Sequence, residues 1–66
     1  MALLKVIEIL AESKKGWEDA TQNAVTEAAK SIRKIRSVYV KNFSAEVDEE
    51  KITRWRVNCK ITFEIE

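Results

Sequence analysis

The side chains that most often carry out catalysis are scarce in this chain. It contains no histidine, and Cys59 is its only cysteine. A cysteine nucleophile needs a nearby base to form the thiolate, and a structural zinc site needs several Cys or His ligands. Cys59 also alternates with polar neighbours in an apolar row, which predicts a buried core position. The residues therefore predict a protein that is not an enzyme and has no zinc site.

The acidic residues form no recognisable catalytic or metal-binding motif. Residues 48–50 read Asp-Glu-Glu, but they lack the alternating oxygen ligands and the glycine of a calcium loop, so we interpret them as a solvated turn. Glu8 lies within an apolar stretch. We expect its charge to point into a subunit interface or a cavity, with a ligand or ion contact as the alternative. Gly16 is the only glycine, which excludes a glycine-rich phosphate-binding loop.

Basic side chains recur on one face of the last predicted strand. Arg54, Arg56 and Lys60 share that face, whereas Trp55 points to the other. The basic and aromatic platform of a protein that binds single-stranded nucleic acid is therefore absent. With 12 basic and 11 acidic residues, the net charge of +1 predicts no attraction to nucleic acid or to anionic membranes. We interpret the basic stripe as an interface or the lining of a pocket.

The hydrophobic pattern predicts a single α+β domain over residues 1–66, in the order strand, helix, strand, strand. Strands are predicted at 3–10, 36–44 and 52–66, with a polar turn at 48–51. A helix is predicted from residue 14 to about residue 34, with Ser13 as its N-cap. Its apolar residues follow one stripe and are mostly alanine, so the helix must lie close to the sheet: Trp17, Ala20, Ala24, Val25, Ala28, Ile32 and Ile35. Trp17 is expected to anchor the helix to the sheet.

The lengths of these elements predict an oligomer. A chain of 66 residues buries only about 60% of its unfolded surface. The last strand would extend about 50 Å, whereas a helix of about twenty residues spans only about 30 Å. The first strand is also apolar on both faces, and the chain can cover only one of them. The residues expected at the interface between copies are Val6, Glu8, Arg54, Trp55 and Val57.

The start of the chain does not read as a targeting segment. The apolar run at residues 1–4 is too short for a signal peptide, and Lys5 interrupts it. No stretch approaches the length of a membrane span. Together with the lone thiol, this predicts a cytoplasmic protein.

The sequence resembles the dodecin family over nearly its whole length. The resemblance rests on Lys5-Val6-Ile7-Glu8-Ile9, on Ser13 followed by Trp17-Glu18-Asp19-Ala20, on the alanine-rich stripe, on Lys51-Ile52-Thr53 and on Thr62-Phe63-Glu64-Ile65. It implies a β-α-β-β fold in which a three-stranded antiparallel sheet partly wraps the helix. It also implies twelve copies in a hollow shell of cubic symmetry. Many dodecins store or buffer flavins, which stack between aromatic side chains near the symmetry axes.

The resemblance also places a ligand pocket. The stacking tryptophan of the flavin-binding members corresponds to Ser37, and the glutamine that hydrogen-bonds the flavin corresponds to Arg56. The acidic position between them is Glu46, and Asn42 is a further polar position. We expect Arg56 to form a salt bridge with Glu46, or otherwise to favour an anionic ligand. Tyr39 or Trp55 is expected to replace the lost ring only after a register shift that turns it to the opposite face.

The chain looks closer to the short group described as calcium dodecins or SecE-like proteins than to the flavin-binding members. A calcium ion or another ion is therefore an open alternative to a flavin (FMN, riboflavin or FAD), with no ligands assigned to residues. The leading hypothesis is a non-catalytic, homododecameric binding or storage shell with weak or no flavin affinity. The alternatives are a genuine flavin-storage dodecin and an oligomeric scaffold that binds partners but no small ligand.

Overall fold

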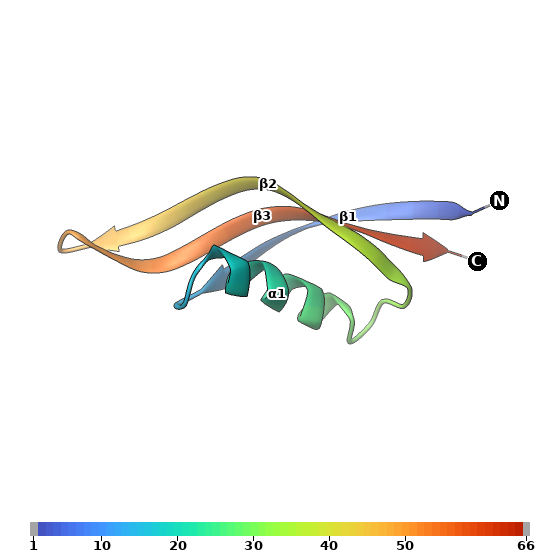
Figure 1. Cartoon of the computed structure of the whole chain (residues 1–66), viewed down its shortest axis with the longest axis horizontal. Helices are drawn as coiled ribbons and strands as arrows, with labels where there is room; N and C mark the ends of the chain where they lie inside the picture. The colour runs from blue at the N-terminus through green and yellow to red at the C-terminus, as the bar shows by residue number, and fades with distance from the viewer. Residues whose placement is uncertain (1, 66) are drawn as a thin grey trace.

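The computed structural model describes residues 2–65, in which one helix lies across one face of a three-stranded sheet (Figure 1). The elements are β1 (Leu3–Ser13), α1 (Trp17–Ala28), β2 (Ile35–Asp48) and β3 (Lys51–Ile65). The strands are ordered β1-β3-β2, and both neighbouring pairs are antiparallel. The predicted order of elements is confirmed, and the sheet has the antiparallel form that the family resemblance implied.

A two-residue turn joins β2 to β3. Glu49 and Glu50 both have positive φ angles, of 50° and 67°, and Asp48 pairs with Lys51 on either side of them. This is the backbone geometry of the turn that best matches the twist of a hairpin. The polar turn was predicted correctly, but β2 continues to Asp48, four residues past its predicted end, because its pairing with β3 persists to the turn. The predicted end of the last strand, Glu66, lies outside the described residues.

The helix is shorter than predicted at both ends. α1 contains 12 residues, Trp17–Ala28, and Gly16 precedes it with a φ angle of 155° and no side-chain cap. After Ala28 the chain turns, and Lys34 adopts a left-handed φ of 59° before β2 begins. Ile32 and Ile35, placed on the helix stripe by their spacing, instead pack against the core from this turn and from β2. Tertiary packing of these β-branched residues overrides the helical spacing.

Ser13 is not the N-cap of the helix, so this prediction is wrong. It is the last residue of β1 and pairs with Trp55. Its Oγ donates a hydrogen bond to Asp19 Oδ2 at 2.6 Å and accepts one from the Lys15 backbone N–H at 2.9 Å. A serine hydroxyl that bonds nearby backbone groups favours a turn. Ser13 therefore stabilises the turn between β1 and α1.

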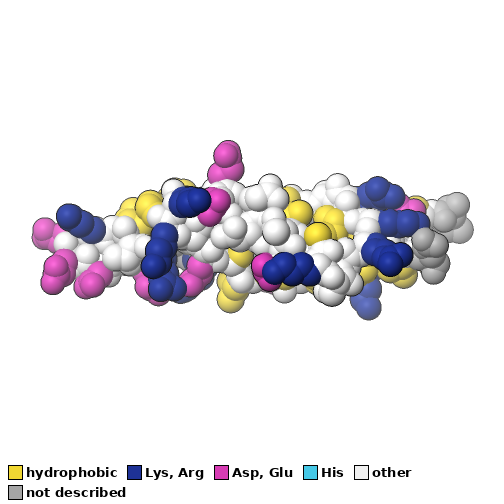
Figure 2. All heavy atoms as spheres, turned by 90° about the horizontal axis from the view of Figure 1, so that it is seen from below, with side chains coloured by type: hydrophobic (Ala, Val, Ile, Leu, Met, Phe, Trp, Pro, Cys, Tyr) yellow, Lys and Arg dark blue, Asp and Glu magenta, His cyan; other side chains and the backbone are white. Residues whose placement is uncertain are grey.

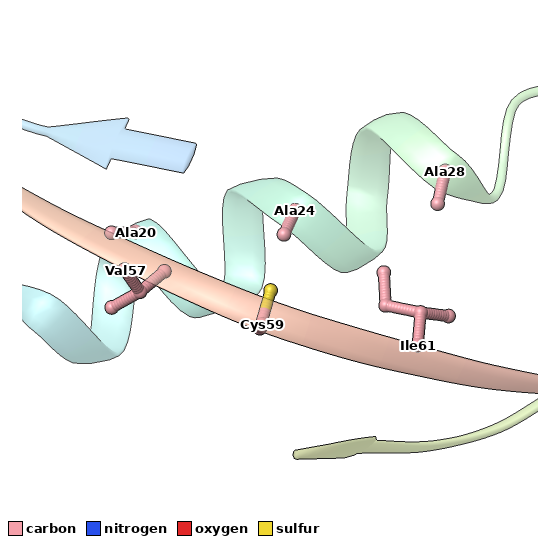
Figure 3. Packing of buried hydrophobic residues seen from close by; sticks show 6 residues of the cluster. All are labelled: Ala20, Ala24, Ala28, Val57, Cys59 and Ile61. Atoms are coloured by element: carbon pink, nitrogen blue, oxygen red, sulfur yellow. The ribbon is translucent and has the colours of Figure 1, made fainter. Parts of the chain in front are cut away.

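The core is a single layer between the helix and the middle of β3 (Figure 3). Ala20, Ala24 and Ala28 lie one helical turn apart and meet buried residues of β3, Cys59 among them. Cys59 has no exposed surface, as predicted, and burial raises the pKa of its thiol. Since alanine has no side chain beyond Cβ, the helix approaches the sheet closely enough to exclude water from this layer.

Much of the sheet extends past the helix. The molecule measures 51 × 20 × 13 Å, and at about 1.5 Å per residue the 12 residues of α1 span only about 18 Å. The radius of gyration is 13.5 Å, compared with about 11 Å for a compact chain of this length. Large apolar side chains stay exposed on all three strands and at the start of α1, some beyond the helix and others on the face turned away from it: Leu3, Leu4, Val6, Leu10, Trp17, Tyr39, Phe43, Val47, Ile52 and Ile65.

Candidate functional site

All four residues predicted for the ligand pocket lie on the face of the sheet that is turned away from the helix. Directly opposed residues in an antiparallel pair share a face, and Val38–Ile61 and Val40–Cys59 face the helix. The intervening pairs face outward, and they contain the four candidates: Ser37–Thr62, Asn42–Asn58, Ser44–Arg56 and Glu46–Arg54. We call this surface the outer face.

The four candidates do not form one pocket within a single chain. Ser37 pairs with Thr62, which lies six residues along β3 from Arg56, a separation of about 20 Å. Asn42 lies between these two positions, and Glu46 lies beside Arg56. Only Glu46 and Arg56 are therefore brought into contact.

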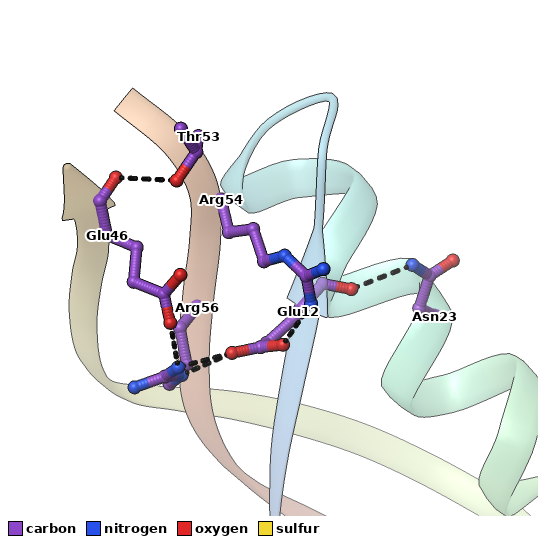
Figure 4. Close-up of polar contacts among 6 residues, drawn as sticks. All are labelled: Glu12, Asn23, Glu46, Thr53, Arg54 and Arg56. Carbon is purple, nitrogen blue, oxygen red and sulfur yellow. Dashed lines mark hydrogen bonds and ion pairs between the residues drawn. The ribbon is translucent and has the colours of Figure 1, made fainter. Parts of the chain in front are cut away.

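The contact between Glu46 and Arg56 is the predicted salt bridge, and it belongs to a larger group (Figure 4). Arg56 Nη2 donates to Glu46 Oε2 at 3.2 Å, and Arg56 Nε donates to Glu12 Oε2 at 2.8 Å. Arg54 Nη1 donates to the other oxygen of Glu12 at 3.3 Å. One carboxylate from each edge strand thus binds an arginine of the central strand. We call these four residues the arginine cluster.

The hydrogen bond from Arg56 is the main reason that the pKa of Glu12 lies below its ordinary value. The same contact raises the pKa of Arg56. Both partners therefore keep their charges at neutral pH, and the cluster is electrically balanced. An anionic ligand would compete with Glu12 and Glu46 for Nε and Nη2 of Arg56.

Sequence reasoning missed Glu12. The predicted first strand ended at Leu10, whereas β1 continues to Ser13 and pairs Glu12 with Arg56. A signal was present, because Glu12 follows Glu8 and Leu10 with the spacing of a strand and so shares their face. The pairing partner could not be read from that spacing.

A second polar group lies at the middle of the outer face. Lys41 is the extra residue of a β-bulge between Val40 and Asn42, and its Nζ lies 3.5 Å from Glu8 Oε2. A hydrogen bond from the Asn58 side chain and the charge of Lys41 lower the pKa of Glu8. Within residues 2–65, Asn58 Oδ1 is buried and has no hydrogen-bond partner. Glu8 is therefore exposed and paired on the outer face, where a second copy or a ligand could reach it.

Tyr39 lies on the same face as Ser37, which corrects the expectation that it would need a register shift. Tyr39 pairs with Lys60 and Ser37 with Thr62, two positions along the same edge strand. Because side chains of a strand repeat their face every second residue, the two lie about 7 Å apart along β2. Tyr39 is 67% exposed. Trp55 is on the opposite face, as expected, because it pairs with Ala45 and Ser13.

The predicted interface residues occupy different environments. Val6 and Arg54 are exposed on the outer face, together with Glu8. Trp55 is half-buried on the helix side of the hairpin. Val57 has no exposed surface, because Ala20 and its neighbours in α1 cover it. Val57 thus lies in the core of its own chain and offers no surface to a second copy.

Trp17 anchors the helix to the sheet, as predicted. Its indole Nε1 donates to the Ser44 backbone carbonyl at 3.0 Å. Its ring also meets Phe43 edge-on, with centroids 5.7 Å apart and planes inclined at 79°. This geometry is a favourable one for two aromatic rings.

Two shallow grooves flank β1. One, of about 500 Å³, runs between residues 9–12 and the outer side of α1, where Asn23 and Glu27 line it. The other, of about 340 Å³, is lined by Glu12, Ser13, Lys14 and Arg54. Across the described part of the chain, no group of three or more Cys, His, Asp or Glu side chains converges as a metal site would require. The Asp48–Glu50 segment forms the hairpin turn.

The comparison with protein families agrees with this architecture. The sequence model of the dodecin family matches residues 3–66. The chain belongs to the dodecin family. None of the curated proteins matches the sequence.

Solved structures, dodecins among them, superpose closely on the chain. A dodecin from Streptomyces coelicolor is 28% identical with a TM-score of 0.94, and the match covers 98% of this chain and 93% of that one. The tt0972 protein from Thermus thermophilus is 26% identical with a TM-score of 0.95, and the match covers 100% and 97%. A calcium dodecin from Mycobacterium tuberculosis, described as calcium chelating, is 32% identical with a TM-score of 0.83, over 97% and 91%. The chain thus has the dodecin fold and is a small binding protein of dodecin type.

Proposed function

We propose that this dodecin is the subunit of a closed homo-oligomer of twelve copies, which acts as a non-catalytic binding or storage shell. The observation that carries the proposal is the exposed apolar surface of the single chain. The total accessible surface of the chain is 5115 Å², compared with about 4300 Å² for a folded monomer of 7.6 kDa. Large apolar side chains are exposed on all three strands, where neighbouring copies could cover them.

We propose further that flavin affinity is weak. Ser37, at the position where the flavin-binding relatives are expected to carry the stacking ring, has no ring to offer. Arg56 stands where their glutamine is expected, and its donors already bind Glu12 and Glu46. A flavin would lose the stacking contact and would have to compete with two carboxylates.

A pocket on the outer face would need two copies of the chain. Ser37 and Arg56 of one chain are about 20 Å apart. A ligand that touches both Ser37 and Arg56 would therefore lie between the outer faces of two copies, with Ser37 supplied by one copy and Arg56 by the other. Assembly would thus precede binding.

The experiment is size-exclusion chromatography with light scattering, monitored also in the visible absorption band of oxidised flavin. Twelve copies of 7.6 kDa make about 91 kDa. We expect that mass without yellow colour. A monomer or dimer would contradict the shell, and a stoichiometric amount of co-purified flavin would contradict weak affinity.

One observation favours genuine flavin binding as the second candidate. Tyr39 is 67% exposed on the outer face, two residues from Ser37 on the same strand, and could stack on a flat ring. If flavin binds through this ring, Tyr39→Ala should lower its affinity by about two- to tenfold, while Tyr39→Phe should keep it. Equal affinity in all three proteins would remove Tyr39 from the site.

Calcium and the scaffold role have their own readouts. Calorimetric titration of the assembled protein with calcium tests the ion, for which one relative is described as calcium chelating. A full shell that binds neither flavin nor calcium would favour the scaffold.

We propose a cytoplasmic location, because Cys59 is a free thiol of the kind that reducing compartments maintain. In residues 2–65, α1 lacks the length and apolar character that a membrane-spanning helix needs.

A further inference from the structure

The two ends of the molecule carry opposite charge (Figure 2). The hairpin end, residues 46–54, contains four acidic and two basic residues, a net charge of −2. The strand end, formed by residues 3–5, 33–36 and 63–65, contains four basic residues and one acidic residue, a net charge of +3. The ends are separated along the 51 Å axis of the chain. They are too far apart to neutralise each other within one molecule, since charges are screened within about 8 Å at physiological salt.

Each end also exposes a cross-strand pair of apolar side chains. At the hairpin end the pair is Val47–Ile52, in which Val47 is 63% exposed and Ile52 is 47% exposed. At the strand end the pair is Leu3–Ile65, in which Leu3 is 58% exposed and Ile65 is 39% exposed. Both pairs lie on the helix side of the sheet, beyond the ends of α1, so the chain itself leaves them uncovered.

We propose that these ends bind each other in neighbouring copies, so that the hairpin end of one chain covers the strand end of the next. The partner is a second copy of this chain, selected by complementary charge around two apolar pairs. Because the two surfaces differ, the contact is head-to-tail, and repetition closes a ring or extends a filament. This inference rests on the proposed function, in which the assembly is closed, and it assigns the surfaces that hold copies together.

Charge reversal tests the contact. Glu49→Lys with Glu50→Lys changes the hairpin end from −2 to +2, and Lys5→Glu with Arg33→Glu changes the strand end from +3 to −1. Each pair of changes opposes like charges, so we expect the subunit concentration at half-assembly to rise by about tenfold or more. The variant with all four changes restores opposite charges and keeps the net charge of +1. We expect it to assemble close to the wild-type concentration.

Variants that neutralise charge instead of reversing it test whether the reversed charges simply disrupt the fold. Glu49→Gln with Glu50→Gln raises the net charge by two, as does Gln22→Lys with Thr26→Lys on the exposed middle of α1. We expect the first pair to weaken assembly and the second pair to leave it unchanged. Far-UV circular dichroism confirms that each variant is folded.

The outcomes separate the two proposals. A monomeric wild type would overturn the shell and this contact together. A wild type that assembles while the charge-reversed variants assemble equally well would overturn the contact alone. Folded double variants that fail to assemble, with no rescue in the fourfold variant, would also overturn it, because the two ends would then not face each other.

Discussion

At the scale of single residues, the outer face of this dodecin is defined by which charges are already paired. The arginine cluster joins all three strands, since Glu12 comes from β1, Glu46 from β2, and the two arginines from β3. Exposed ion pairs contribute little to stability individually. Here they fix the positions of side chains that a ligand at the outer face would meet, and they occupy Nε and Nη2 of Arg56.

The lowered pKa of Glu12 makes a prediction for acid stability. A carboxylate whose pKa is lower in the folded than in the unfolded chain stabilises the fold above its ordinary value of 4.5, and this contribution is lost as pH falls through the folded pKa. Glu12→Gln should therefore be less stable than wild type at pH 7, and the difference should disappear on acidification. Urea unfolding at a fixed protein concentration, from neutral pH to about pH 3, measures it.

Glu18→Gln is the matched control, because it removes an exposed carboxylate of α1 away from the arginines. It should leave the pH dependence as in wild type. A constant difference between Glu12→Gln and wild type at every pH would assign Glu12 a role other than its charge.

Ser37 provides a residue-scale test of the ligand site. Ser37→Trp restores a stacking ring at an exposed outer-face position. Since aromatic stacking adds about 0.5–1.5 kcal/mol, flavin affinity should rise by about two- to tenfold. Gln22→Trp places the same ring on the exposed side of α1, away from the outer face, and should not give this gain. Fluorescence quenching of FMN measures both, and equal affinities would remove Ser37 from the site.

At the scale of elements, the separation of the helix from the sheet depends on the alanine stripe. Ala24 is 2% exposed and faces β3 at the middle of α1. Ala24→Leu overpacks this layer and should destabilise the fold by about 1–3 kcal/mol. Gln22→Leu, on the exposed side of the same helix, should change stability by less than about 0.5 kcal/mol. Similar effects of the two changes in thermal unfolding would mean that the helix does not need its close approach.

The two edge strands differ in how regularly they pair with β3. β2 departs from regular pairing with β3 at three places, whereas β1 pairs with β3 without interruption from Leu3 to Ser13. Bulges and inward-turned charges discourage further strand pairing. One bulge directs Lys41 over the sheet toward Glu8. β1 is therefore the more regular edge, although Asn23 of α1 covers its end by donating to the Glu12 carbonyl at 3.2 Å.

At the scale of the whole molecule, the long hairpin is the feature that a single chain cannot bury. Trp55 is half-buried at its base, on the helix side, next to exposed Phe43 and Val47. Trp55→Arg places a charge in this apolar surface and should prevent assembly. Light scattering measures the loss, with circular dichroism to verify the fold. Thr26→Arg adds the same charge on the exposed middle of α1, away from the hairpin, and is the control that should assemble. A fully assembled Trp55→Arg protein would exclude this surface from the interface.

The sequence by itself determined the order of the elements, the buried face of β3 and the surplus of apolar surface. Each of these follows from local periodicity, because side chains of a strand alternate and those of a helix repeat every three to four residues. The alternation around Cys59 was enough to place it in the core. The excess length of β3 over any helix the chain could form was enough to predict uncovered apolar residues.

Only the tertiary structure decided which residues meet across the sheet. The strand order β1-β3-β2 brings Glu12 and Glu46 to Arg56. Two irregularities in pairing reset the face of β2, and a third resets that of β3, at positions that spacing cannot reveal. It also ended the helix at Ala28, because Ile32 and Ile35 gain more by packing on the sheet than by continuing the helical stripe. Periodicity specifies the face on which a side chain lies, whereas its partner depends on strand order and register, which long-range packing sets.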